Sequence, residues 1–161
     1  MSDEPNVHTH SDWERDLGEQ GARGSRLAPG LGLSDLGCAL YELDPGGQAA
    51  PYHVHHGNEE LLLVLDGTLE LRTPEGTRTV GPGAVAGFPK GADGAHRLRN
   101  VSDGPARYVL ISTMRVPDIA EQLDTGTVLA IKGGADGWAF PAGSEGDYFR
   151  LSTEAIEADA G

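Results

Sequence analysis

Side chains that could bind a metal are concentrated in the segment Pro45–Gly67, PGGQAAPYHVHHGNEELLLVLDG, which contains half of the chain's six histidines. His53 and His55 are two residues apart, so on a β-strand both would point to the same face. A turn after them would bring Glu60 back to the same place, and a further histidine, His96, begins another alternating segment. Three imidazoles and one carboxylate are good ligands for a divalent transition metal, and they would leave a position open for water or substrate.

A solvated loop is the alternative interpretation of the same residues. An isolated His-x-His pair is usually exposed polar sequence, and short motif matches are only hypotheses until their structural context is known. The spacing of the histidines alone therefore leaves both a metal site and a polar loop open.

The residues around these histidines are predicted to form short β-strands. Apolar or alternating runs are bounded by clusters of Gly, Pro, Asn and Asp, with a turn about every 8–12 residues, which is typical of an antiparallel sandwich or barrel. No helix of ten or more residues is predicted before residue 117. The predicted strands span residues 36–43, 52–56, 60–65, 68–72, 77–80, 84–88, 96–101 and 107–113.

The two ends of the chain are predicted as extensions of one domain, residues 31–113. Residues 1–30 are polar and glycine-rich and are expected to be mobile or to drape over the rest. Residues 114–161 are expected to pack on the barrel and to finish in an acidic stretch. Within them the pattern indicates a helical turn or two at 117–123, strands at 128–131 and 148–151, and a short helix at 152–161.

The composition limits the classes of partner. The formal net charge is −13, and such an acidic surface repels nucleic acid and anionic membranes. Cys38 is the only cysteine, and the N-terminal residues lack a basic region followed by an apolar run, so we expect a cytoplasmic protein. The acidity also suggests a salty cytoplasm, where screening removes the self-repulsion.

Glycines at fixed offsets from the histidines distinguish the two interpretations, because with them the sequence resembles the cupin superfamily. The first cupin motif, G(X)5HXH(X)3-4E(X)6G, is matched at every spacing by Gly47, His53, His55, Glu60 and Gly67. The second, G(X)5PXG(X)2H(X)3N, is followed by Gly83, Pro89, Gly91, His96 and Asn100, with four residues instead of two before the histidine. The short segment between the motifs is similar to that of small, single-domain microbial cupins of the cupin 2 type.

This resemblance implies an all-β fold, a cupin jelly-roll β-barrel, with N- and C-terminal extensions. It implies His53, His55, Glu60 and His96 as ligands of one divalent transition metal, either Fe, Mn, Ni or Zn. The strand alternation then suggests which residues line the pocket or support the ligands. These are His56, Leu62, Val64, Phe88, Leu98 and Asn100, with His56 on the opposite face and the aliphatic residues also compatible with plain core.

Two functions remain open from the sequence. The first is a metalloenzyme that oxidises, isomerises or decarboxylates a small oxygenated compound. The second is a non-catalytic module that binds or senses a sugar or small acid. No general acid or base is identified beyond the ligand set. Since cupin barrels commonly pair, and the ends of this chain are long, we also expect a homodimer.

Overall fold

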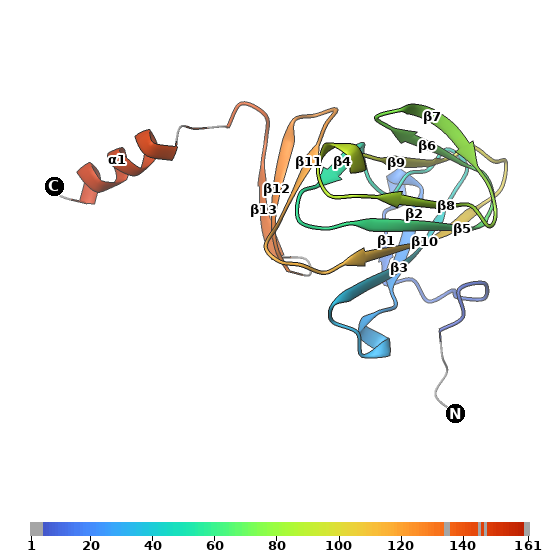
Figure 1. Cartoon of the computed structure of the whole chain (residues 1–161). Helices are drawn as coiled ribbons and strands as arrows, with labels where there is room; N and C mark the ends of the chain where they lie inside the picture. Colours follow the sequence, from blue (N-terminus) through green and yellow to red (C-terminus); the bar gives the residue numbers. More distant parts are fainter. Residues whose placement is uncertain (1–4, 134–135, 145, 147, 160–161) are drawn as a thin grey trace.

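The computed structural model describes residues 5–133, 136–144, 146 and 148–159, and its described part is almost entirely β-structure in three antiparallel sheets (Figure 1). The largest sheet has the strand order β1-β2-β3-β10-β5-β8, the second β13-β12-β11-β4, and the third β7-β6-β9. The strands are β1 Arg15–Asp16, β2 Ala22–Arg26, β3 Leu36–Leu43, β4 His53–His55, β5 Glu60–Asp66, β6 Leu69–Thr73, β7 Gly76–Val80, β8 Val85–Phe88, β9 Arg97–Asn100, β10 Ala106–Thr113, β11 Asp118–Gln122, β12 Thr127–Gly133 and β13 Asp136–Phe140.

The sheets pack face to face as a jelly roll, as predicted. An isolated bridge between His53 and His96 connects the second sheet to the third, and together these two oppose the large sheet. The hydrogen-bonded ladders do not close into a continuous barrel. Buried side chains from both layers meet between them, among them Leu62, Leu71 and Tyr108, and form the main core. The four predicted ligands lie on β4, at the start of β5 and just before β9.

The N-terminal residues take part in the large sheet. β2 pairs with β3 along its length, from Ala22 opposite Leu43 to Arg26 opposite Ala39. Trp13 and Leu27 pack against Val109 and its neighbours in a second, smaller apolar cluster. The sequence did not predict β2, because its residues, ARGSR, lack the apolar alternation of a half-buried strand.

Of the four predictions for the C-terminal residues, two are wrong and two are confirmed, among them the helix at 152–161 over its described residues, 152–159. Residues 117–123 are not helical turns: Asp118–Gln122 is β11, because its backbone is paired on both sides, with β4 and with β12. Residues 148–151 are not a strand: they begin the helix α1, Tyr148–Asp159, which lies apart from the sheets (Figure 1). The predicted strand at 128–131 is confirmed within β12.

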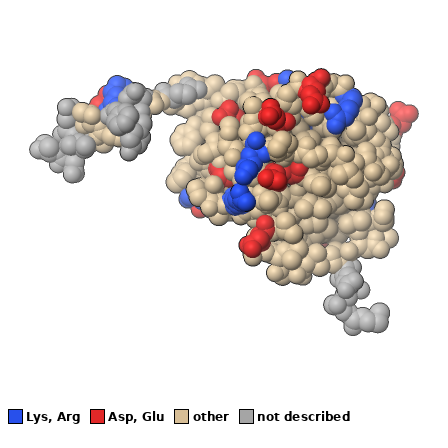
Figure 2. Space-filling view, in the orientation of Figure 1, with Lys and Arg blue, Asp and Glu red and all other residues tan. Residues whose placement is uncertain are grey.

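Acidic and basic side chains are interspersed on the face shown in Figure 2. No single basic surface of the kind that binds a phosphate backbone is seen on that face. Within the described residues, no helix is long and apolar enough to span a membrane.

Candidate metal centre

The strand β4 carries two of the histidines on one face. His53 and His55 point inward, and Val54 between them is buried on the other side against Tyr52 and Ala95. β4 is fixed along both edges: β11 pairs with it on one side, and the backbone of His96 exchanges two hydrogen bonds with that of His53 on the other. The same-face prediction for the two histidines is therefore confirmed.

Glu60 and His96 reach the same place from different sheets. Glu60 is the first residue of β5 and lies opposite Phe88 of β8. His96 immediately precedes β9 and is 2% exposed. A short 3-10 turn, Ala92–Gly94, occupies the loop that carries the two extra residues of the second motif, and this turn leaves His96 in position.

The four side chains converge on one carboxylate oxygen. Glu60 Oε2 lies 3.2 Å from His96 Nε2 and 3.9 Å from His55 Nε2. His53, Glu60 and His96 each offer a ligand atom, and these atoms all lie within 4.8 Å of one another. The rings of His53 and His96 are 4.6 Å apart, and those of His53 and His55 are 5.2 Å apart and nearly perpendicular. The structure thus brings His53, Glu60 and His96 together as one group of possible ligands, and the fourth predicted ligand, His55, lies beside that group, 3.9 Å from Glu60 Oε2.

Each histidine is oriented by a hydrogen bond at its other nitrogen. The Nδ1 atom of His53 lies 2.9 Å from the carbonyl oxygen of Pro51, and that of His96 lies 3.0 Å from the carbonyl oxygen of Gly94. The Nδ1 atom of His55 lies 2.6 Å from a carboxylate oxygen of Asp118. All three acceptors are oxygens, so each neutral ring carries its proton on Nδ1 and leaves a lone pair on Nε2. Such fixing of the tautomer is the usual arrangement of metal-binding histidines.

Two buried atoms at the centre have no hydrogen-bond partner: Glu60 Oε2 and His96 Nε2. These two atoms lie 3.2 Å apart but do not meet the geometry of a hydrogen bond. Unpaired buried polar atoms are costly, and a bound cation between them would remove the cost. The residues present therefore fit a divalent metal.

Two of the four side chains, His53 and Glu60, have shifted pKa values. Burial, and then the neighbouring His96, lower the pKa of His53 to about 4, so its imidazole is neutral near pH 7. Burial would by itself raise the pKa of Glu60, but interaction with the histidines in their protonated form, His96 foremost, outweighs it and leaves that pKa lowered. A metal would bind the ionised carboxylate and would replace any proton on the Nε2 atoms, since metal ligands must be deprotonated.

Asp118 contacts the candidate site, and the sequence analysis did not identify it. It is 2% exposed, and besides His55 it accepts a hydrogen bond from the backbone N–H of Gly57 at 2.7 Å. Burial would raise the pKa of Asp118, but its hydrogen bonds, including those from His55 and Gly57, lower it. In β11 the polar Asp118 is buried and the apolar Ile119 is exposed, the reverse of the usual pattern, so hydrophobic patterning did not identify Asp118.

A cavity of about 380 Å³ opens beside the four ligands. Tyr41 and Tyr108 border it, and their rings stack at 5.2 Å. Burial raises the pKa of both phenols, which therefore stay protonated at neutral pH. Within the described part of the chain neither hydroxyl is hydrogen-bonded, so both remain free to donate to a ligand.

The residues predicted to line the pocket or support the ligands fall into four groups. Leu98 borders the cavity, and Phe88 stacks on the ring of His96 at 3.8 Å, nearly parallel to it. Leu62 and Val64 are fully buried in the core below the site. Asn100 donates to the carbonyl oxygens of Leu43 and Gly104 and so holds the turn that follows β9. His56 points to the opposite, exposed side, where its Nε2 lies 2.9 Å from Glu121.

Comparison with known proteins agrees with this geometry. Residues 39–112 match the family model described as a cupin domain, Cupin_2. The chain therefore contains a cupin domain of the Cupin_2 type and has structural neighbours in the cupin superfamily. Comparison with curated protein sequences gave no significant match.

Two solved structures named as sugar phosphate isomerases resemble the chain over most of its length. The one from Silicibacter pomeroyi is 28% identical, with a TM-score of 0.71, and the match covers 80% of this chain and 82% of that one. The one from Acidithiobacillus ferrooxidans is 22% identical, with a TM-score of 0.75, covering 87% and 91%. A polyketide cyclase from Streptomyces resistomycificus is 23% identical, with a TM-score of 0.55, covering 66% and 78%.

Proposed function

We propose that the protein is a small metal-dependent enzyme that acts on an oxygenated small molecule. One observation carries the proposal: three histidines, each with Nδ1 engaged by an oxygen, direct Nε2 towards the Glu60 carboxylate at the edge of a cavity. A structural metal site is normally closed by its ligands, whereas a site that opens into a cavity leaves room for a substrate.

His53, His55, Glu60 and His96 would hold Fe, Mn, Ni or Zn. The metal would supply Lewis acidity to a substrate oxygen or, for a redox-active ion, electron transfer. Phe88 shields one face of the His96 ring from water, and Asp118 holds the proton of His55 on Nδ1. Tyr41 and Tyr108 have free hydroxyls that can donate hydrogen bonds to a bound substrate. These groups would orient a substrate and support a charge that develops on its oxygen.

Isomerisation is the first reaction class to assay, because the neighbour from Silicibacter pomeroyi is named as an isomerase and is 28% identical. Oxidation and decarboxylation follow. The competing function is a binding or sensing module with a retained metal. The absence of an assigned acid–base residue favours that alternative, and the open ligand set favours the enzyme.

The test is turnover by the metal-loaded protein on a panel of small hydroxy acids, keto acids and sugars, with and without oxygen. Conversion that is lost in His96→Ala, and retained in the exposed control His56→Ala, would support the enzyme. Tight binding of a panel compound without turnover, kept after metal removal, would support the binding module and contradict the proposal.

A further inference from the structure

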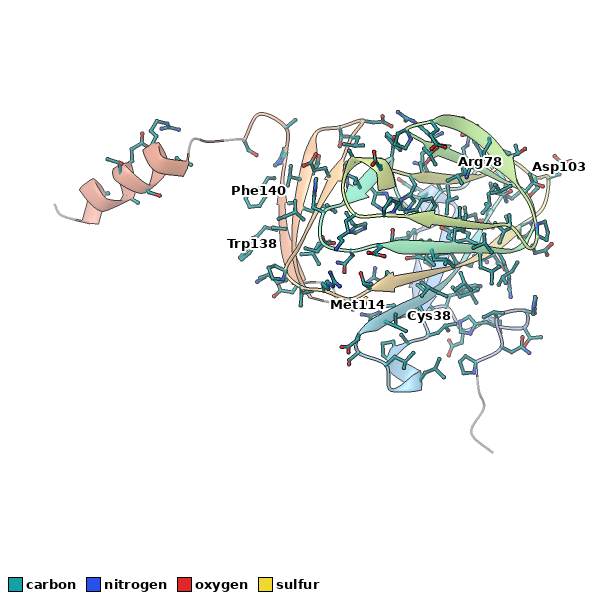
Figure 3. The ribbon with its side chains drawn as sticks, viewed as in Figure 1. Cys38, Arg78, Asp103, Met114, Trp138 and Phe140 are labelled. Atoms are coloured by element: carbon teal, nitrogen blue, oxygen red, sulfur yellow. The ribbon has the colours of Figure 1, made fainter. Side chains whose placement is uncertain are left out.

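The wall of the cavity away from the metal ligands is mainly apolar. Leu98 and Leu110 border its inner part, and Leu33 and Met114 border its mouth. The two mouth residues are 45% and 43% exposed, although both are large apolar side chains. Met114 lies at the end of β10 beside β3 (Figure 3). Exposed apolar side chains that line a concave site usually mark a surface covered by a ligand.

Glycine at position 37 makes room for Met114 at this mouth. A Cβ built on Gly37 would lie 2.7 Å from Met114 Sδ and 2.4 Å from Ser112 Oγ. The absence of a side chain in β3 therefore lets these two residues of the neighbouring β10 region lie across it. This end of the cavity is a packed wall and not merely an open edge of the sheets.

The positive charges that border the cavity are already neutralised. Arg26 forms an ion pair with Glu14, and Arg97 donates to Glu70 Oε1 at 2.6 Å. Arg97 keeps one buried nitrogen, Nε, without a partner, but the guanidinium remains held by Glu70. Within the described part of the chain no lysine borders the cavity. A phosphate dianion would thus meet no free cation except the metal, in a protein whose net charge is −13.

The charge of the ligand set also favours a monoanionic ligand over a dianionic one. Neutral imidazoles and one carboxylate around a divalent ion leave one positive charge, which one anionic oxygen group of a ligand balances. We propose that this site takes a monoanionic oxygen chelator with an apolar tail, which lies along Leu33, Leu110 and Met114, and not a phosphorylated sugar. This inference rests on the proposed function, because the chelating head needs the metal.

Three hydroxamates with the same chelating head test the inference by isothermal titration of the metal-loaded protein. Acetohydroxamate has a methyl tail, hexanohydroxamate an apolar chain, and phosphonoacetohydroxamate a phosphonate. Partial burial of the added methylenes should make hexanohydroxamate bind about tenfold more tightly than acetohydroxamate. The phosphonate should bind no more tightly than acetohydroxamate. Leu33→Ser and Met114→Ser should each reduce the advantage of the longer chain to about threefold or less, with acetohydroxamate unchanged.

Val101→Ser is the matched control, because Val101 is 45% exposed and does not border the cavity. It should leave all three affinities unchanged. Equal binding of the two alkyl hydroxamates, or tighter binding of the phosphonate, would overturn the inference alone. The inference would also be overturned if Leu33→Ser and Met114→Ser changed the oligomeric mass of the protein and none of the three affinities. If no hydroxamate binds the metal-loaded protein, both the proposed function and the inference fail.

Discussion

At the scale of single residues, the site depends on what holds each imidazole as much as on the imidazoles themselves. Pro51 and Gly94 supply backbone carbonyl oxygens, which substitution of their side chains does not remove. Asp118 is different, since it is a buried carboxylate that accepts from both His55 Nδ1–H and the backbone N–H of Gly57. It is therefore the orienting group that mutation can test.

Asp118→Asn should weaken metal binding by about 10- to 100-fold, the usual effect of losing a partner of a metal-bound histidine. An asparagine side chain has one oxygen, so either His55 or Gly57 loses its acceptor, and the negative charge is lost as well. The measurement is a metal titration against a competing chelator. Glu121→Gln, on the same strand but paired with the exposed His56, is the control and should bind metal as the wild type does. Equal affinities in the two variants would contradict the assigned role of Asp118.

The sequence predicted the four candidate ligands but not their supports. Alternation placed His53 and His55 on one face, and motif spacing added Glu60 and His96. The role of Asp118 depends on the pairing of β11 with β4, which joins residues about sixty positions apart in the chain. No local pattern encodes that pairing, so Asp118 could be found only in the folded structure.

At the scale of elements, the loop between β8 and β9 shows how an insertion can be absorbed. The loop with the two extra residues contains the three-residue 3-10 turn Ala92–Gly94, which presents the Gly94 carbonyl to His96. A Cβ on Gly94 would lie 1.6 Å from the carbonyl oxygen of Pro89, which is backbone and cannot move aside cheaply. The turn and the histidine are thus coupled through one glycine.

Gly94→Ala should lower the free energy of unfolding by about 1–3 kcal/mol, in the range of overpacked sites, and should also weaken metal binding, since the turn must shift. Chemical denaturation of the metal-free protein and a metal titration measure the two effects. Gly81→Ala is the control, because nothing lies within 4 Å of its added Cβ. If Gly94→Ala matches Gly81→Ala in both measurements, the turn does not position His96.

Elements with clear alternation and turn residues were predicted well, from β3 to β10. β11 was missed because its apolar Ile119 faces solvent and its polar Asp118 faces inward. The first turn of α1 was predicted as a strand because aromatic and β-strand propensities are weak guides outside a sheet. Local sequence preference predicted an element correctly where the burial of its side chains followed the hydrophobic pattern. It failed where strand pairing or the candidate site reversed that burial.

At the scale of the whole molecule, the outer surface of the large sheet is apolar at β5, β8 and β10. Leu61, Val85 and Ile111 are 40%, 62% and 36% exposed there, and Leu61 lies opposite Ile111 in the ladder. Trp138 and Phe140 also point away from the sheets, on β13 (Figure 3). Contiguous exposed apolar surface of this kind is typical of association.

We therefore expect a homodimer whose mass falls to that of the monomer in Val85→Glu, because a charge placed in the apolar face would be buried without a partner. Light scattering measures the mass. Thr79→Glu, on the exposed strand β7, should leave it unchanged. A wild-type protein with the monomer mass would contradict the expectation.

The net charge of −13 gives a second expectation for the whole molecule. If the protein is adapted to salt, its unfolding midpoint should rise between low and molar KCl, since screening relieves the repulsion among acidic side chains. Thermal unfolding followed by circular dichroism provides the midpoints. A midpoint that stays constant or falls with salt would count against adaptation to a saline cytoplasm.

Elemental analysis of protein purified without added metal or chelator tests the proposed metal site most directly. His53→Ala removes a ligand, whereas His56→Ala removes a neighbouring histidine on the opposite face and serves as the control. We predict near-stoichiometric Fe, Mn, Ni or Zn in the wild type and in His56→Ala, and little in His53→Ala. A wild-type protein that contains none of these metals and takes up none when they are supplied would contradict the account.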